Sequence, residues 1–434
     1  MNSALSLEQT PPLAVPARYF LTAPLFAAAA AVLLLWEGPA ALAGRWSPTG
    51  LALTHLLTLG FIAMVMVGAV QQLLPVLAGA PIRHALWASR VLHVLLSAGT
   101  VALAVGLWAG AAAWLHGAAL LLLAFVLGFA AAAGEALARS RSSHATVTAM
   151  ALSVAALAVT AALGLYLAAG HMGAGVPLAR QWTDVHLAWG LAGWVGLMVI
   201  GVAYQVVPMF QVTPDYPRAV VRWLGPAVFL GLVVWSSGVF LERGTEILGA
   251  WLAGLGALIV AAGLAAFAVI TLRLQAQRRR RLPDVTLSFW RIGLASLLLA
   301  VALAVALAVR PDLQAVLALP LGVAVVAGFA VSVINGMLYK IVPFLVWLHL
   351  TNRMQWTGAG SLRVPNMKQV IPERRTRIQL WLHGAALSAL LAAALLPGPL
   401  TYLAAALFLL SNGLLWINLL DGVLLYRRTC RACA

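Results

Sequence analysis

Two histidines in corresponding parts of a repeated segment are the residues of this sequence best suited to chemistry. His55 precedes Pro75 by 20 residues, and His186 precedes Pro208 by 22 residues. Neutral imidazole is a common ligand of haem iron, copper and zinc, and a histidine inside an apolar span is usually functional. We therefore predict that His55 and His186 bind a metal ion or a haem. The alternative is a pair of interfacial histidines that hydrogen-bond to loops.

The segment that contains each proline occurs three times. Residues 68–75 read GAVQQLLP, residues 201–208 read GVAYQVVP and residues 336–343 read GMLYKIVP, at offsets of 133 and 135. The third copy has no histidine near the corresponding position, Val323. The repeat predicts a single membrane domain, residues 1–434, that is built from three related units. We place the units at residues 1–144, 145–284 and 285–434.

The composition excludes a soluble domain, because 63% of the residues are hydrophobic, only 9% are charged and the mean hydropathy is +0.99. Apolar runs of about 20 residues cross a bilayer core of about 30 Å. Their backbone groups must bond within the segment, so we expect helices. The twelve predicted spans are residues 19–36, 50–74, 90–110, 113–134, 146–169, 185–207, 222–241, 247–270, 288–309, 313–347, 379–396 and 399–425.

The net charge of +16 is a signal of membrane topology. If both termini are cytoplasmic, 22 of the 27 Lys and Arg residues fall in internal loops or tails and four in external loops. This bias obeys the positive-inside rule, and basic runs such as residues 278–281 would anchor loops at the anionic leaflet. We therefore predict lipid as the partner of the basic residues and exclude nucleic acid. Four spans in each unit keep the three units parallel.

Further candidate residues lie at the two ends of the spans. On the external side, Arg45 and Arg180 would suit the propionates of a haem, or would serve as interfacial anchors. His116 opens the fourth span on that side and is a third candidate for cofactor binding. The glycines of span six, Gly190 and Gly193 among them, predict tight helix packing or leave room for a flat macrocycle.

Polar residues near the internal ends of the spans are the other candidates. Lys340 and Asp421 lie at similar depth, and we expect them to pair, because a charge there needs a partner. Together they would form a proton path or contact a quinone head group. The alternative is that the uncharged members satisfy backbone groups near the prolines or bond between helices. The set consists of Lys340, Asp421, Tyr204, Tyr339, Gln72, Gln205, Gln71 and Asn335.

These features resemble subunit I of the haem–copper oxidases and nitric oxide reductases, in which histidines lie near the outer ends of spans two and six. The segment from His55 to Gly60 and Phe61, continuing to Gly68 and Pro75, is also similar to the second span of NnrS-type nitric-oxide-response proteins. The resemblance implies an all-α membrane fold of twelve transmembrane helices. They would form three four-helix arcs with pseudo-threefold symmetry, with both termini cytoplasmic.

The same resemblance implies a function in a respiratory or nitrosative-stress role at the inner membrane of a bacterium. His55 would ligate a haem b and His186 a copper or a non-haem iron. The protein would handle electrons or a diatomic gas, O2 or NO, as an oxidoreductase. Electrons would come from a quinol or a separate cytochrome c, and further membrane subunits or a homo-oligomer would be possible partners.

The sequence departs from that family at several ligand positions. Residues 222–241 lack the expected pair of histidines, and residues 313–347 lack the expected His-x-His. No tyrosine follows His186 closely, since the chain reads HLAW there. The usual binuclear centre cannot be assembled, so the resemblance implies a divergent member with one haem, one haem plus one metal, or none. No catalytic residue is identified.

Two other functions fit a chain of twelve spans. A transporter or permease is the common protein with this number of spans, but such carriers repeat every six spans, whereas the period here is four. A cofactor-free assembly factor on the same fold would explain the missing ligands. A haem absorption band would separate these alternatives from the first.

Overall fold

The computed structural model describes residues 9–79, 81–140, 145–241, 245–279, 282, 284–357 and 364–432. Within these ranges the chain is helical and contains no strand. In this described part of the chain, twelve helical stretches are long and apolar enough to cross a membrane. The predicted number of spans and the class of multi-pass membrane protein are therefore confirmed.

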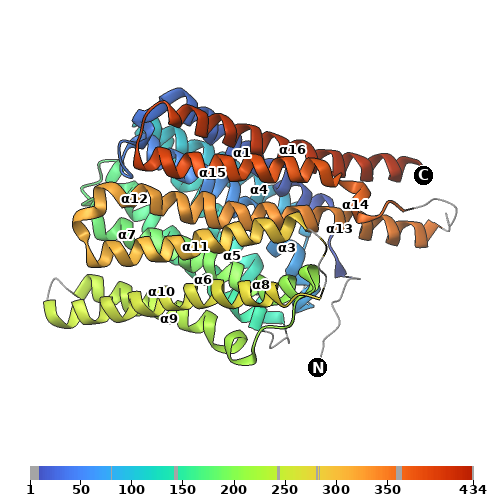
Figure 1. The fold of residues 1–434 in the computed structure, drawn as a ribbon, viewed down its shortest axis with the longest axis horizontal. Helices are drawn as coiled ribbons and strands as arrows, with labels where there is room; N and C mark the ends of the chain where they lie inside the picture. The colour runs from blue at the N-terminus through green and yellow to red at the C-terminus, as the bar shows by residue number, and fades with distance from the viewer. Residues whose placement is uncertain are drawn as a thin grey trace.

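The helices follow the three units of the sequence (Figure 1). The first unit contains α1 (Ala14–Glu37), η2 (Gly38–Leu42), α2 (Pro48–His55), η3 (Leu56–Ala63), α3 (Met64–Ala78), α4 (Ala85–Ala109) and α5 (Ala112–Arg139). The second contains α6 (Ala145–His171), α7 (Arg180–Ala188), η4 (Trp189–Gly196), α8 (Leu197–Gln211), α9 (Arg218–Leu241) and α10 (Glu246–Ala276). The third contains α11 (Val285–Val309), η5 (Pro311–Leu313), α12 (Gln314–Val323), η6 (Ala324–Val331), α13 (Ser332–Thr357), α14 (Met367–Val370), α15 (Glu373–Leu395) and α16 (Leu400–Ala432).

A π-helical segment of eight residues interrupts the second span of every unit. η3, η4 and η6 begin at Leu56, Trp189 and Ala324, which are separated by the same 133 and 135 residues as the copies of the proline segment. The repeat is therefore present in the backbone conformation as well as in the sequence. π-helical turns are rare and occur frequently at functional sites. His55 immediately precedes the first of these segments, and His186 lies three residues before the second.

Glycines hold each second span against the first span of its unit. A Cβ added at any of six glycines would lie less than 3.0 Å from a side-chain atom of that first span, so only glycine allows the observed approach. The two sets of three glycines follow the repeat offsets. The contacts are Gly60–Phe26, Gly193–Ala156 and Gly328–Ser296, and then Gly68–Tyr19, Gly201–Ala149 and Gly336–Phe289. They confirm the prediction of tight helix packing for Gly193.

The same neighbours recur in each unit. The first span contacts the second, and the third contacts the fourth in α4–α5, α9–α10 and α15–α16. Consecutive units meet through α5–α6 and α10–α11, and α16 packs on α1. The π segment η6 contacts both η3 and η4, so the three second spans meet in the interior. Helix α1 begins and helix α16 ends at the same end of the bundle, which we name the terminal end (Figure 1).

The predicted tenth and eleventh spans leave residues 348–378 between them, and the structure shows that much of this interval is helical. Helix α13 continues to Thr357 and α15 already begins at Glu373, with the short α14 between them and residues 358–363 outside the described part. Asn366 caps α14 by accepting hydrogen bonds from the backbone N–H of Lys368 and Gln369. The prediction failed because it marked helices by apolar runs, and the last turns of α13 are polar.

Candidate functional site

His55 and His186 lie beside each other at the end of the bundle opposite the terminal end. Their ring centroids are 6.3 Å apart and the ring planes are inclined by 31°. Both side chains are half-buried. His55 ends α2 and His186 lies in α7, so the meeting of the second spans brings together two residues that are 131 positions apart in the sequence.

Each imidazole is oriented by a backbone carbonyl. His55 Nδ1 lies 2.8 Å from the Leu51 oxygen, and His186 Nδ1 lies 3.0 Å from the Thr160 oxygen of α6. A carbonyl oxygen only accepts, so Nδ1 of each neutral ring carries the proton and Nε2 keeps its lone pair. Gly164 leaves space for the ring of His186, because a Cβ there would lie 3.1 Å from its Cε1 atom. Both Nε2 atoms are therefore electronically free to bind a metal.

The spacing of the rings suits two ligands of one metal ion. Metal–nitrogen bonds to histidine are about 2.0–2.1 Å long and the ring centroid lies about 1 Å beyond the nitrogen, so two imidazoles on one ion would have centroids up to about 6 Å apart. The observed distance is 6.3 Å. The described residues contain no group of three or more His, Cys, Asp and Glu side chains that could hold a metal. The pair therefore fits an ion whose other ligands come from elsewhere, as haem iron takes four from its macrocycle.

A polar network joins the three units at the same end of the bundle as the histidines. Arg45 Nη2 donates to Asp184 at 2.7 Å, Arg180 pairs with the same carboxylate at 3.4 Å, and Arg180 Nη2 donates to Gln314 at 2.6 Å. The Arg45 Nε and Gln181 Nε2 atoms are buried donors without a partner among the described residues. These two donors could serve an incoming carboxylate, such as a haem propionate.

His116 lies apart from this arrangement. It is exposed on α5, and its Nδ1 atom bonds to the Ala112 carbonyl of the same helix at 2.8 Å. The described contacts do not connect the exposed ring of His116 with His55 or His186.

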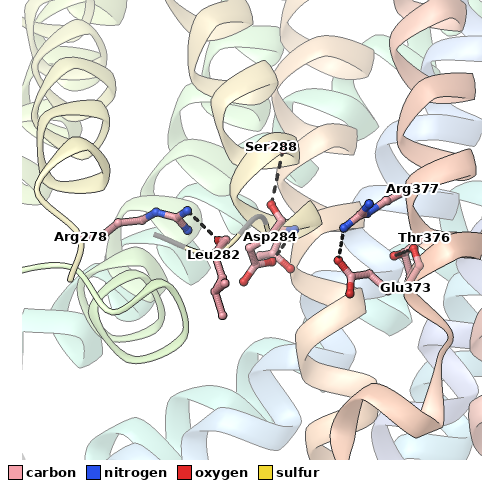
Figure 2. Close-up of polar contacts among 8 residues, drawn as sticks. Arg278, Leu282, Asp284, Ser288, Glu373, Thr376 and Arg377 are labelled. Carbon is pink, nitrogen blue, oxygen red and sulfur yellow. Dashed lines mark hydrogen bonds and ion pairs between the residues drawn. The ribbon is translucent and has the colours of Figure 1, made fainter. Parts of the chain in front are cut away.

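The expected pairing of Lys340 with Asp421 is wrong. Lys340 Nζ lies 2.9 Å from Asp284, and Asp421 pairs with Arg375. Asp284 also accepts a hydrogen bond from Thr286 N at the start of α11, and Figure 2 shows its carboxylate beside that helix. The side chains of Asp421 and Arg375 are both nearly half exposed. The Asp421 carboxylate therefore lies near the surface, where it pairs with an arginine of α15.

The remaining inner candidates are distributed over the three units, and no described contact joins them into one path. Tyr204 donates to the Val220 carbonyl of α9 at 3.2 Å, and Tyr339 accepts from Asn418 of α16 at 3.0 Å. Each of these two tyrosines therefore makes a hydrogen bond between helices. Gln205 is half-buried, and the buried Gln72 has an Oε1 atom without a partner in the described chain.

The sequence did not single out a fully buried polar contact in the third unit. Ser332 follows η6 directly, and its Oγ atom lies 2.7 Å from His383 Nε2 of α15. Both side chains are inaccessible to solvent. Comparing the repeats would have signalled it, because the positions that correspond to Ser332 are Leu197 and Met64.

Comparison with known proteins assigns no family to the chain. No protein-family model matches it, and no curated protein matches its sequence. The histidine pair and the repeated helices therefore carry the functional argument.

Proposed function

We propose that this chain is an integral membrane haem-binding protein that resembles subunit I of the haem–copper oxidases and nitric oxide reductases, and that it handles electrons or a diatomic gas. The observation that carries the proposal is the pair His55 and His186. Their rings lie 6.3 Å apart, and each Nδ1 is engaged by a carbonyl, so each Nε2 is free to bind a metal. The ion is the iron of a haem b, or alternatively a single copper or non-haem iron.

The proposal includes the arrangement of the helices. We infer three four-helix arcs related by pseudo-threefold symmetry, with both termini in the cytoplasm. Support comes from the three π segments at constant offsets, from the six glycine contacts that follow the same offsets, and from the packing of α16 on α1. The excess of basic residues in loops at the terminal end supports its cytoplasmic location.

The residues of the chain perform three tasks in this proposal. The carbonyls of Leu51 and Thr160 fix the tautomer and the orientation of the two imidazoles, as outer-shell hydrogen bonds do in metal sites. Arg45 and Gln181 supply buried donors for carboxylates. The half-buried position of the rings limits the access of water. A bound haem would supply an iron that changes oxidation state or binds a gas.

A cofactor-free assembly factor on the same fold is the second candidate. It is favoured by the lack of any group of three metal-ligating side chains in the described ranges, because a protein that binds its own catalytic metal usually provides at least three ligands. The transporter alternative has less support, since the helix contacts recur every four spans rather than every six.

A reduced-minus-oxidised absorption spectrum, with metal analysis of the same purified sample, tests the proposal. We expect a Soret band from the native protein and its loss or displacement in His55→Ala and in His186→Ala. His84→Ala is the matched control, since His84 is exposed in the connection before α4, and it should leave the spectrum unchanged. His116→Ala shows whether the third candidate takes part.

The proposal fails if the purified protein is colourless and contains no stoichiometric metal. It also fails if the band is the same in native protein and in both histidine variants. A colourless protein that exchanges a labelled solute across vesicles would instead establish the transporter.

A further inference from the structure

Buried polar side chains gather between α13, α15 and α16 in the third unit. Six of them have no accessible surface, although the surrounding helices are strongly apolar. Tyr339 and Asn418 continue the group toward the terminal end and are also buried. The six are Ser332, Asn335, Gln379, His383, Ser411 and Asn412. We name these eight residues the polar column.

Hydrogen bonds link the column across the three helices at successive levels. His383 Nε2 lies 2.7 Å from Ser332 Oγ, and Gln379 Nε2, one turn along α15, donates to Ser411 Oγ at 3.0 Å. Asn418 Nδ2 donates to Tyr339 Oη at 3.0 Å. Ser332, Asn335 and Tyr339 follow at spacings of three and four, which place them along one face of α13. The next residue, Lys340, is ion-paired with Asp284 and partly exposed, so the column runs from the interior to the terminal end.

The column contains polar atoms that its own residues do not satisfy. Both side-chain amide atoms of Asn335 are buried without a partner among the described residues. Four further atoms are also buried without a partner in the described chain: Nδ1 of His383 and one side-chain oxygen each of Gln379, Asn412 and Asn418. Buried polar groups in proteins almost always have a partner, and an internal water molecule typically makes about three hydrogen bonds to such groups.

The repeat shows that the fold does not require polar residues at two positions of the column. The positions that correspond to Asn335 are Ile200 and Val67, which are buried and apolar. The positions that correspond to Ser332 are Leu197 and Met64, which are also buried. Among the three copies, these two positions are therefore polar in the third unit alone, which indicates a ligand there rather than a need of helix packing.

We propose that the polar column is a binding site for a chain of internal water molecules, held between α13, α15 and α16 and open toward the terminal end. Asn335 donates to and accepts from this water at the middle of the column. The Nδ1 atom of His383 bonds to it at the end of the column farthest from the terminal end. The binding of water does not rest on the proposed function. Its use does, since such a chain would carry protons from the terminal end into a redox protein.

X-ray radiolytic footprinting of the full-length protein in nanodiscs tests the proposal, because bound water produces hydroxyl radicals beside the side chains that it touches. Phe289 is the probe: it is fully buried, and its ring lies 5.5 Å from that of His383 and 6.1 Å from that of Tyr339. Phe129 is equally buried but packs on Phe125 and Trp194. We expect Phe289 to be oxidised at least about fivefold faster than Phe129, since Phe289 adjoins the polar column, whereas Phe129 adjoins a single unpartnered polar atom, Trp194 Nε1.

Asn335→Val tests the source of that water, because it installs the residue that the first unit has at Val67. The rate at Phe289 should fall toward the rate at Phe129. The matched control is Ser153→Ala, which removes a buried hydroxyl bonded to the Trp194 carbonyl of the second unit, and Phe289 should then be labelled as in the native protein. Equal rates at Phe289 and Phe129 in the native protein overturn the proposal without any variant, as does an unchanged Phe289 rate in Asn335→Val. Neither result depends on whether haem binds.

Discussion

Gly201 provides the sharpest test of the repeated packing between first and second spans, because a new side chain there would meet a single methyl group. A Cβ at Gly201 would lie 2.5 Å from Ala149 Cβ and 3.4 Å from the Thr146 oxygen. Carbon atoms in contact are about 3.5–4.0 Å apart. Gly201→Ala therefore requires α6 and α8 to separate by roughly 1 Å, and such overpacking costs about 1–3 kcal/mol of the free energy of unfolding.

Exchanging the two residues should restore the fit. Ala149→Gly removes the methyl group that the new Cβ would meet, so the double variant again has one methyl group between the helices. We expect the double variant to lie within about 1 kcal/mol of the native protein, which is the scale of helix-propensity differences between Gly and Ala. A double-mutant cycle on the detergent-solubilised protein, with unfolding followed by tryptophan fluorescence, measures the coupling between the two positions. Gly254→Ala is the control, because this helical glycine has no atom within 4 Å of the added Cβ.

Two results would refute this reasoning. Gly201→Ala as stable as the native protein would mean that the two helices do not approach each other closely at this level. A double variant no more stable than Gly201→Ala alone would mean that Ala149 is not the residue in contact. Either result would remove one of the six glycine contacts that support the repeat in three dimensions.

Two further predictions concern residues near the membrane surfaces. Asp284 caps α11 and pairs with Lys340, so Asp284→Ala should lower the free energy of unfolding by about 0.5–2 kcal/mol, and Asp284→Asn, which keeps the cap, should lower it less in the same unfolding assay. Burial raises the pKa of the Tyr216 hydroxyl above its ordinary value of about 10. The folded state therefore holds this proton more tightly, and its contribution to stability is present below pH 10 and lost as the pH rises further. Tyr216→Phe should make the free energy of unfolding fall less steeply above pH 10, as measured by unfolding at several alkaline pH values.

The sequence predicted the spans well because the bilayer imposes one requirement, a long apolar helix, on each of them. It did not predict the π segments, because a π turn and an α turn leave the same apolar composition in a segment such as Leu56–Ala63. It also ended the tenth span too early. The residues of α13 beyond the apolar run continue the helix to Thr357, and no apolar signal marks that extension.

Residue depth was easier to predict than the direction in which a side chain points. The depth of Lys340 and Asp421 follows from their positions along the spans. Their partners depend on the rotation of each helix about its axis, and the structure pairs Lys340 with Asp284 and Asp421 with Arg375. The same ignorance of rotation left open whether His55 and His186 would meet. Their rings do lie beside each other, which the repeat made plausible and only the packing of the second spans could decide.

The histidine pair departs from the repeat in a way that bears on its ligand. His55 corresponds in the repeat to Ala188 and Val323, whereas His186 corresponds to Leu53 and Leu321, so the two imidazoles come from positions two residues apart. Histidine at one position in all three units would bring three imidazoles together, the protein ligand set of many catalytic zinc sites. This chain instead keeps two imidazoles, 6.3 Å apart, and apolar residues at the corresponding positions of the third unit. We propose haem iron rather than a zinc ion held by the protein alone, because two imidazoles would supply two ligands and the macrocycle would supply the other four.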